Sequence, residues 1–248
     1  MKLLNDWLGF FKPLQVKNLQ IFWSGQACAL IGMWLQVTAM GILVYSISGG
    51  SATAVGLLAA LNALPFFLGG MLLAGLGDRF DRRKLLIAVQ SVQWLVAAVL
   101  FLLTFLDALQ LWHLYAAGLV MGINQTVGFP TQQAFVGDLI PRKQLQEAVG
   151  MYSLVFNTCR AVGPALAGYI IAEWGAATAF GGNVLASLPL IGCLVSLKGH
   201  ISEAAAPKKQ RGSGRKVSGL KAVLSTRSLL FIMLSALIQN LSLIHISE

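Results

Sequence analysis

Residues 75–84 read GLGDRFDRRK, a strongly charged stretch placed between two long apolar segments. The segment before it, near 53–76, and the segment after it, near 85–106, each reach the length of about 20 residues that a helix needs to cross a bilayer. A short charged turn between two such segments is typical of adjacent membrane-spanning helices. We therefore expect this part of the chain to lie in a membrane.

The same alternation of apolar segments and short polar breaks runs along most of the chain. Spanning helices are predicted near 20–47, 53–76, 85–106, 111–135, 146–172 and 176–197. The composition agrees, because the 248 residues are 56% hydrophobic and only 11% charged, with a mean hydropathy of +0.73. A soluble domain carries about 25% charged residues. So apolar a chain could not cover a surface that faces water, which excludes a soluble globular protein.

The positions of the basic residues predict the orientation. The net charge is +9, and every Lys and Arg except Arg160 lies before residue 18 or within 77–84, 138–147 or 198–227. These regions alternate with loops that carry no basic residue, so the positive-inside rule places the N-terminus and 198–227 in the cytoplasm. A basic segment can also bind nucleic acid. We expect instead a cytosolic tether that touches anionic lipid headgroups, and no nucleic-acid partner.

Four parts of the chain are expected. Residues 1–197 would form a six-helix transmembrane domain, 198–227 a cytoplasmic basic linker, 228–240 the start of transmembrane helix seven, and 241–248 a tail that does not belong to the protein.

That tail, Leu241–Glu248, reads LSLIHISE, which is the translation of a transposase adapter used in sequencing libraries. We interpret it as an artefact, so that the natural protein would continue beyond Asn240 and this chain would lack its C-terminal half. The alternative is that the residues continue helix seven, with His245 and Glu248 as candidate proton carriers.

Cofactor, metal and enzyme chemistry are not indicated. The three cysteines, Cys28, Cys159 and Cys193, all fall inside apolar segments, and no Cys/His spacing resembles a metal site. An enzyme would need clustered nucleophiles, acids or bases at one membrane face. His113 and His200 are predicted on opposite sides of the membrane, so we expect neither an enzyme nor a bound cofactor.

The charged stretch resembles the loop between helices two and three of the major facilitator superfamily, G-x-L-A-D-R-x-G-R-K. Ala74 stands in place of the first glycine and Asp81 in place of the second, a form similar to the enterobactin-exporter and macrolide-efflux branch. The resemblance implies an all-α membrane protein, with the N-terminal six-helix bundle of a major facilitator fold plus the start of helix seven. It also implies a gating charge network that forms in one access state and breaks in the other. The candidate members are Asp78, Arg79, Asp81, Arg82 and Arg83. The alternative is a short solvated loop that only sets topology.

A second stretch, Phe129 to Gly168, resembles the end of helix four, the following loop and helix five of the same branch. Gly163 and Pro164 with Gly168 are similar to the antiporter motif G-P-x-x-G-G, although Ala167 replaces one glycine. Proline removes a backbone donor and small residues allow close helix approach. The resemblance implies a hinge, and the alternative is an ordinary small-residue packing seam.

Arg160 is the one charge within a predicted spanning segment, about 18 Å along its helix. Because a charge at mid-bilayer costs at least ~2.5 kcal/mol, it should face a partner or a wet cavity. It is a candidate for binding a polar or anionic substrate group or for sensing a coupling ion. The alternative is that it caps carbonyls or pairs with Asn157, itself a candidate lining residue.

Other candidate lining residues are polar or aromatic. Many facilitator antiporters carry an arginine in helix four, whereas this chain has Asn124 and Gln125, which could line the cavity or pair between helices. Trp34 and Gln36 are lining candidates by family position. Tryptophans near helix ends are expected to be interfacial anchors: Trp23, Trp112 and Trp174.

The resemblance implies a secondary transporter of a bacterial inner membrane that exports drugs, siderophores or similar amphipathic molecules by alternating access. Its expected partners are a small-molecule substrate, protons, the lipid bilayer and the missing C-terminal half, and the chain alone should be inactive. A proton carrier would be Asp78 or a residue of that missing half. The alternative is a non-transporting membrane scaffold or sensor, which leaves the charged loop unexplained.

Overall fold

The computed structural model describes residues 17–73, 80–140 and 144–196. These residues form helices and connecting turns, without a strand. The helices are α2 (Lys17–Ile47), α3 (Ala52–Leu73), α5 (Arg82–Phe105), α6 (Leu111–Leu139), α7 (Leu145–Trp174) and α8 (Ala176–Ser196). All of them fall in one compact unit, Met1–Ala206. The prediction of an all-α bundle of six helices in this part of the chain is confirmed.

Local sequence explains where these helices end. Gly49 and Gly50 follow α2 with φ of 68° and 88°, and Gly175 follows α7 with φ of 81°. Glycine adopts this left-handed region without the steric cost of a Cβ atom, so it ends a helix and lets the chain reverse. At the start of α5, the Asp81 carboxylate accepts a hydrogen bond from the Lys84 backbone N–H at 3.0 Å, which satisfies one of the free donors of the first turn.

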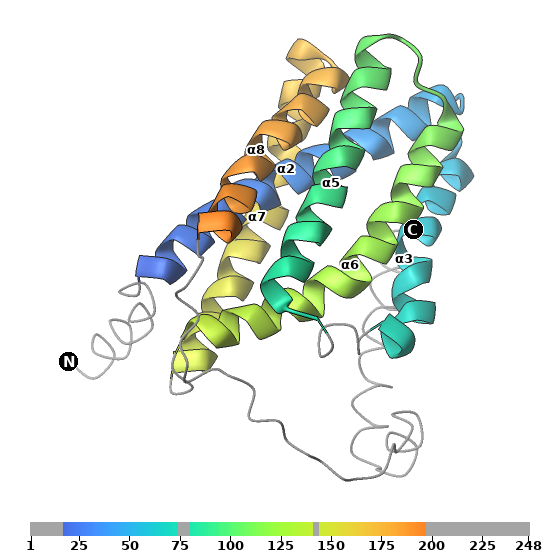
Figure 1. Ribbon diagram of the computed structural model, residues 1–248. Helices are drawn as coiled ribbons and strands as arrows, with labels where there is room; N and C mark the ends of the chain where they lie inside the picture. The colour runs from blue at the N-terminus through green and yellow to red at the C-terminus, as the bar shows by residue number, and fades with distance from the viewer. Residues whose placement is uncertain (1–16, 74–79, 141–143, 197–248) are drawn as a thin grey trace, which may run out of the picture. The chain divides into compact units, whose positions relative to one another are not determined.

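α2 packs mainly against α7 and α8, and α5 packs against α6 and α8. Figure 1 shows α8 and α7 beside α2, α5 next to α8, and α6 running alongside α3. Interior prolines lie in α3, α6, α7 and α8: Pro65, Pro130, Pro164 and Pro189. Each removes a backbone donor from its helix.

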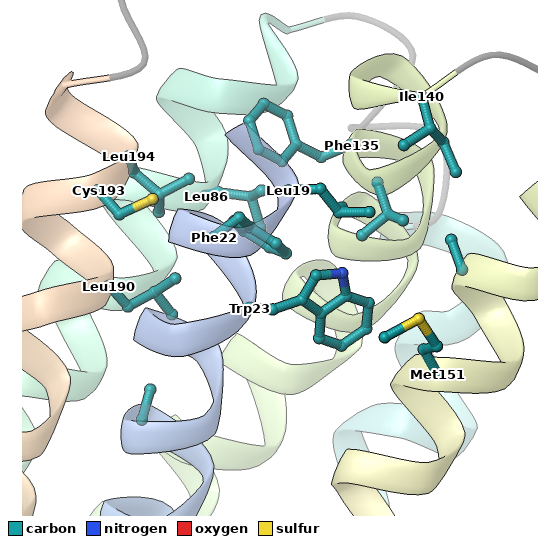
Figure 2. Close-up of a cluster of buried hydrophobic side chains, with 13 residues drawn as sticks. Leu19, Phe22, Trp23, Leu86, Phe135, Ile140, Met151, Leu190, Cys193 and Leu194 are labelled. Atoms are coloured by element: carbon teal, nitrogen blue, oxygen red, sulfur yellow. The ribbon is translucent and has the colours of Figure 1, made fainter. Parts of the chain in front are cut away.

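Two clusters of buried apolar side chains hold the bundle together. Figure 2 shows the first cluster, in which Phe22 and Trp23 of α2 meet Leu86 of α5, Met151 of α7 and Leu194 of α8. It lies where α2, α5 and α7 begin and where α6 and α8 end. The second cluster lies toward the opposite helix ends: Leu35, Ala39, Met40, Val44, Leu58, Leu100, Leu114, Ala117, Met121, Ala167, Ala179 and Phe180.

The outside of the bundle is apolar, as a membrane protein requires. Among the described residues, four helical stretches are long and apolar enough to cross a bilayer: Leu19–Ile47, Arg82–Phe105, Leu145–Trp174 and Ala176–Ser196. A shorter apolar stretch, Ala52–Phe66, lies in α3. Helix α6 has 29 residues, and its amide side chains, such as Asn124 and Gln125, lower its hydropathy.

The three tryptophans expected as interfacial anchors do not behave alike. Trp112 is 60% exposed and Trp174 is 61% exposed, at the start of α6 and the end of α7, as the prediction requires. Trp23 is only 5% exposed and belongs to the first cluster. The prediction for Trp23 was wrong, because its ring packs inside the bundle against Tyr152 of α7, at 5.7 Å between ring centroids.

Several predicted features lie outside the described residues. They are the first gating candidates, Asp78 and Arg79, and the predicted linker 198–227, the helix-seven start 228–240 and the tail 241–248.

Candidate functional site

Three consecutive residues at the start of α5 connect three helix ends. Asp81 caps α5 itself through the Lys84 N–H. Arg82 Nη1 donates to both carboxylate oxygens of Asp138, at 2.7 and 2.9 Å. Arg83 donates from Nε to the Leu194 carbonyl at 2.6 Å. We call the contacts of Asp81, Arg82 and Arg83 with their partners the α5 junction.

Each arginine of the junction meets the negative end of another helix. Asp138 lies in the last turn of α6, and Arg83 Nη2 also donates to the Val195 carbonyl of α8 at 2.9 Å. The last carbonyls of a helix have no partner inside it and carry the negative end of its dipole, so a guanidinium there is stabilising. The side chains of Arg82 and Asp138 are 34% and 18% exposed, so this ion pair is only partly screened by solvent.

Asp138 is a residue that sequence reasoning missed. The helix predicted near 111–135 stops short of Asp138, whereas the structure places this residue inside α6, opposite Arg82. The sequence offered one signal. Asp138 is a carboxylate just after a predicted spanning segment, on the membrane side where the basic loop 77–84 is also predicted. That signal does not choose between Arg82 and its basic neighbours.

A groove lies between the C-terminal half of α6 and the N-terminal half of α7. It has a volume of about 140 Å³ and is lined by Phe129, Gln132, Gln133, Val136, Val149, Tyr152, Ser153, Phe156 and Asn157. We call it the α6–α7 groove. Asn157, a predicted lining residue, forms part of its wall, and its amide donates to the Ser153 carbonyl one turn back, at 2.7 Å.

Aromatic rings connect the groove to the interior of the bundle. Tyr152 lies 6.3 Å from Phe129, 6.1 Å from Phe156 and 5.7 Å from Trp23, measured between ring centroids. Phe156 in turn lies 6.3 Å from Trp34. These distances are typical of favourable aromatic contacts. Trp34 therefore stands behind the groove wall, and its indole N–H is buried without a hydrogen-bond partner among the described residues.

Arg160 lies on α7 one turn beyond Asn157, and its side chain is exposed. No ion pair or hydrogen bond joins it to any residue of 17–73, 80–140 or 144–196. The alternative of an Arg160–Asn157 pair has no support among the described contacts, in which Asn157 donates its amide N–H to the Ser153 carbonyl and accepts nothing from Arg160.

Gln36 lies inside the bundle, with no exposed surface. Its Oε1 accepts from Asn183 Nδ2 of α8 at 2.5 Å, and its Nε2 donates to the Met121 sulfur of α6 at 3.0 Å. Gly32, one turn before Gln36, makes room for the Asn183 side chain, because a Cβ there would meet the Asn183 Cα at 3.0 Å. These contacts link α2, α8 and α6 through polar groups that would be costly to leave unpaired.

The two amides predicted on helix four differ in their surroundings. Asn124 donates to the Val89 carbonyl of α5 at 2.9 Å, so it makes a contact between helices. Gln125 is exposed. The side-by-side pair thus places one amide against α5 and the other on the outside of the bundle.

The three residues of the predicted hinge also differ. Gly163 is buried, and a Cβ there would lie 2.8 Å from Trp34 Cγ, so this glycine allows α7 to pack closely on α2. Pro164 lies inside α7 and is exposed. Around Gly168 a Cβ would meet nothing within 4 Å.

A larger cavity of about 330 Å³ lies between α2, α3 and α6. Its lining is aliphatic apart from Asn62, whose amide already donates to the Gly118 carbonyl at 3.3 Å. Among the described residues, no group of three or more His, Cys, Asp or Glu side chains is placed to hold a metal ion.

Comparison with known proteins agrees with this architecture. Residues 8–246 match the family model described as "transmembrane secretion effector". The staphyloferrin A transporter of Staphylococcus aureus (strain NCTC 8325 / PS 47) is 28% identical over 160 residues, 64% of this chain and 40% of that protein. Macrolide efflux protein A of Streptococcus pyogenes is 25% identical over 175 residues, 70% of this chain and 41% of that protein.

Tetracycline resistance protein, class C, of Escherichia coli is 31% identical over 157 residues, 63% of this chain and 38% of that protein. The chain spans about two fifths of the length of the curated relatives it matches. No solved structure matches it.

The bundle, its apolar exterior and the α5 junction define a multi-pass α-helical membrane protein. The chain belongs to the major facilitator superfamily, within the family of transmembrane secretion effectors. These three relatives are named for transport of staphyloferrin A, efflux of macrolides and resistance to tetracycline.

Proposed function

We propose that this chain is the N-terminal part of a secondary active transporter that exports small amphipathic molecules from a bacterial cell. The transporter would work by alternating access in the inner membrane, with its N-terminus in the cytoplasm and with protons as the coupling ion. The rest of the transporter would be a C-terminal half that closes the other side of the pathway, so the chain alone would be inactive.

The observation that carries this proposal is the exposed Arg160 within a spanning helix. A charged side chain that faced lipid near mid-membrane would cost at least ~2.5 kcal/mol. This face of α7 is therefore best explained by contact with water or with a polar partner inside the membrane. Water or a polar group at such a face is what a transport pathway within a membrane bundle requires.

The α5 junction supplies a candidate gate. It joins the ends of α5, α6 and α8 through one ion pair and two hydrogen bonds to carbonyls. Such contacts can be made in one access state and broken in another, because each is worth only about 1 kcal/mol when partly exposed. We propose that Asp78 and Arg79 belong to the same gate and that Gly163 and Pro164 let α7 bend when it opens.

The proposal is tested by substrate accumulation in cells that express the complete gene. A panel of a macrolide, a tetracycline and a siderophore covers the substrates named for the relatives. Cells with the gene should accumulate less of at least one compound than cells without it, and a protonophore should remove the difference. Asp78→Asn should raise accumulation to the level of cells without the gene, at equal protein in the membrane.

Equal accumulation with and without the gene, for every compound of the panel, would count against export of this class of molecule. If cells with the gene still accumulate less compound in the presence of the protonophore, the result would support export and would contradict protons as the coupling ion.

A further inference from the structure

The α6–α7 groove has the size and lining to hold one aromatic ring. Its volume of about 140 Å³ is close to the ~150 Å³ of an engineered apolar cavity that binds benzene. Phe129, Tyr152 and Phe156 line it, and Tyr152 is in contact distance of both phenylalanines. A ligand ring placed among these side chains would gain edge-to-face and stacked contacts in addition to burial of its area.

The polar groups of the groove can donate hydrogen bonds. Gln132 lines the groove, and its Nε2 is buried without a partner in the described part of the chain. Because that nitrogen is closed off from solvent, the amide that a ligand in the groove can reach is that of Gln133, which also lines the groove and is exposed. Ser153 and Asn157 are already bonded to carbonyls of α7 through their own donors.

Arg160 extends this lining in the direction of the helix axis. Val149, Ser153, Asn157 and Arg160 follow one another at spacings of four, four and three residues, which place them on one face of α7. Arg160 begins ~4.5 Å beyond Asn157 along the axis. The guanidinium is not part of the groove lining, but helical side chains lean toward the N-terminus of their helix, so an extended Arg160 side chain can reach a ligand that fills the groove.

No carboxylate among the described residues opposes this charge at the groove. The acidic residues of α6 and α7 are Asp138, Glu147 and Glu173. Asp138 is paired with Arg82, Glu147 lies in the first turn of α7, Glu173 lies at its far end, and none of the three lines the groove. The groove therefore has an aromatic wall and a free amide donor, and the uncompensated Arg160 lies on α7 one turn beyond its Asn157 end.

We propose that the α6–α7 groove and Arg160 form a subsite for an aromatic anion, with the ring among Phe129, Tyr152 and Phe156 and the anionic group on the Arg160 guanidinium. The exported class would then be amphipathic molecules with an aryl group and a carboxylate or similar anion one short linker apart. This inference rests on the proposed export function. It adds to that function a preference for anionic ligands, and it assigns this preference to the α6–α7 groove and Arg160.

Binding to the complete protein in nanodiscs of phosphatidylcholine tests the subsite without requiring transport. Calorimetric titrations with phenylpropionate, phenylpropanol and phenylpropylammonium compare one ring that carries an anion, a neutral group or a cation. Empty nanodiscs give the lipid background. The carboxylate should bind at least about tenfold more tightly than the alcohol, as one charge-assisted hydrogen bond predicts, and the ammonium should bind most weakly.

Two pairs of variants separate the charge from the ring. Arg160→Gln should bring the affinity for phenylpropionate down to that for phenylpropanol, whereas Arg160→Lys should keep most of the preference. Phe129→Leu should weaken all three ligands by a similar factor. Phe105→Leu, at a residue that is 68% exposed at the end of α5 and distant from the groove, is the matched control and should change none of them.

Equal affinities for the carboxylate and the alcohol in the unmodified protein would overturn the subsite, and so would an equal loss of both in Arg160→Gln. Occupation of the groove by lipid or by another part of the protein would show as absence of binding, which also overturns it. The transport assay is read separately. A protein that exports the panel without binding phenylpropionate loses only the subsite, and one that binds it through Arg160 without exporting anything loses only the transport proposal.

Discussion

Gly163 shows at the level of a single residue why two glycines of the same helix are not equivalent. Both Gly163 and Gly168 lie in α7, five positions apart in the sequence. A Cβ at Gly163 would meet Trp34 Cγ at 2.8 Å and Cδ1 at 3.3 Å, whereas a Cβ at Gly168 would meet nothing within 4 Å. Close approach of α7 to α2 therefore depends on the first glycine only.

We predict opposite effects of adding one methyl group at these positions. Gly163→Ala should destabilise the bundle by about 1–3 kcal/mol, because Trp34 must shift and it is held against Phe156. Gly168→Ala should be neutral or stabilising by up to about 1 kcal/mol, because alanine loses less backbone entropy in a helix. Unfolding of the purified protein in mixed micelles by increasing dodecyl sulfate, followed by circular dichroism, measures both. A similar loss at both sites would contradict the packing explanation.

Residue roles were only partly predictable from the sequence. The pattern around Gly163 and Pro164 marked a bend or a packing seam without naming the partner, because sequence spacing does not show which helix lies opposite. Gln36 was expected to line a cavity, and the structure shows it buried and bonded to Asn183, a residue far along the chain. A polar residue in an apolar segment predicts a partner, and the identity of that partner depends on tertiary packing.

At the level of elements, the first turn of α5 joins this helix to the ends of two others. Its N-terminal residues contact the last turns of α6 and α8. Arg82 Nη1 reaches both carboxylate oxygens of Asp138, so this pair joins the first turn of α5 to the last turn of α6.

We predict a measurable coupling between these two residues. In a double-mutant cycle of Arg82→Gln and Asp138→Asn, the coupling energy should be about 0.5–1 kcal/mol, since the pair is partly exposed and a solvent-screened ion pair contributes little more. The same unfolding titration supplies the four values. Lys84→Gln is the control, because the Lys84 side chain is exposed and only its backbone N–H takes part in the junction. A coupling energy of zero would mean that the contact adds nothing to stability.

The bounds of the elements were the most predictable part of the fold. Each predicted segment agrees with a described helix to within a few residues, for instance 85–106 against Arg82–Phe105. Length and polar breaks suffice for this, because a bilayer fixes how long an apolar helix must be. The α6–α7 groove was not predictable from the sequence. It forms where the two helices separate, and the periodicity of apolar residues along each helix does not depend on that separation.

For the whole molecule, the distribution of basic residues predicts which side of the membrane each turn faces. The turn before α5 would be cytoplasmic, and the turn between α5 and α6, which carries no basic residue, would face outward. The structure supplies exposed positions in both turns, Phe80 and Ala108, where a label can be attached without disturbing a described core residue.

We predict that a membrane-impermeant maleimide reaches Ala108→Cys in intact spheroplasts and reaches Phe80→Cys only after permeabilisation. The unsubstituted protein, with Cys28, Cys159 and Cys193 in its spanning helices, gives the background for both. Labelling in the reverse order would place the N-terminus outside and would invert every assignment of sidedness made above.

The α5 junction implies that the same arginines act at two stages in the life of the protein. During insertion, Arg82 and Arg83 are unpaired charges that help retain their turn on one side of the membrane. After folding, their guanidinium groups are occupied by Asp138 and by the α8 carbonyls, and of the described basic residues in this turn Lys84 keeps an exposed side chain. The mature protein should therefore sense the anionic lipid content of the surrounding leaflet through Lys84 far more than through the arginines beside it.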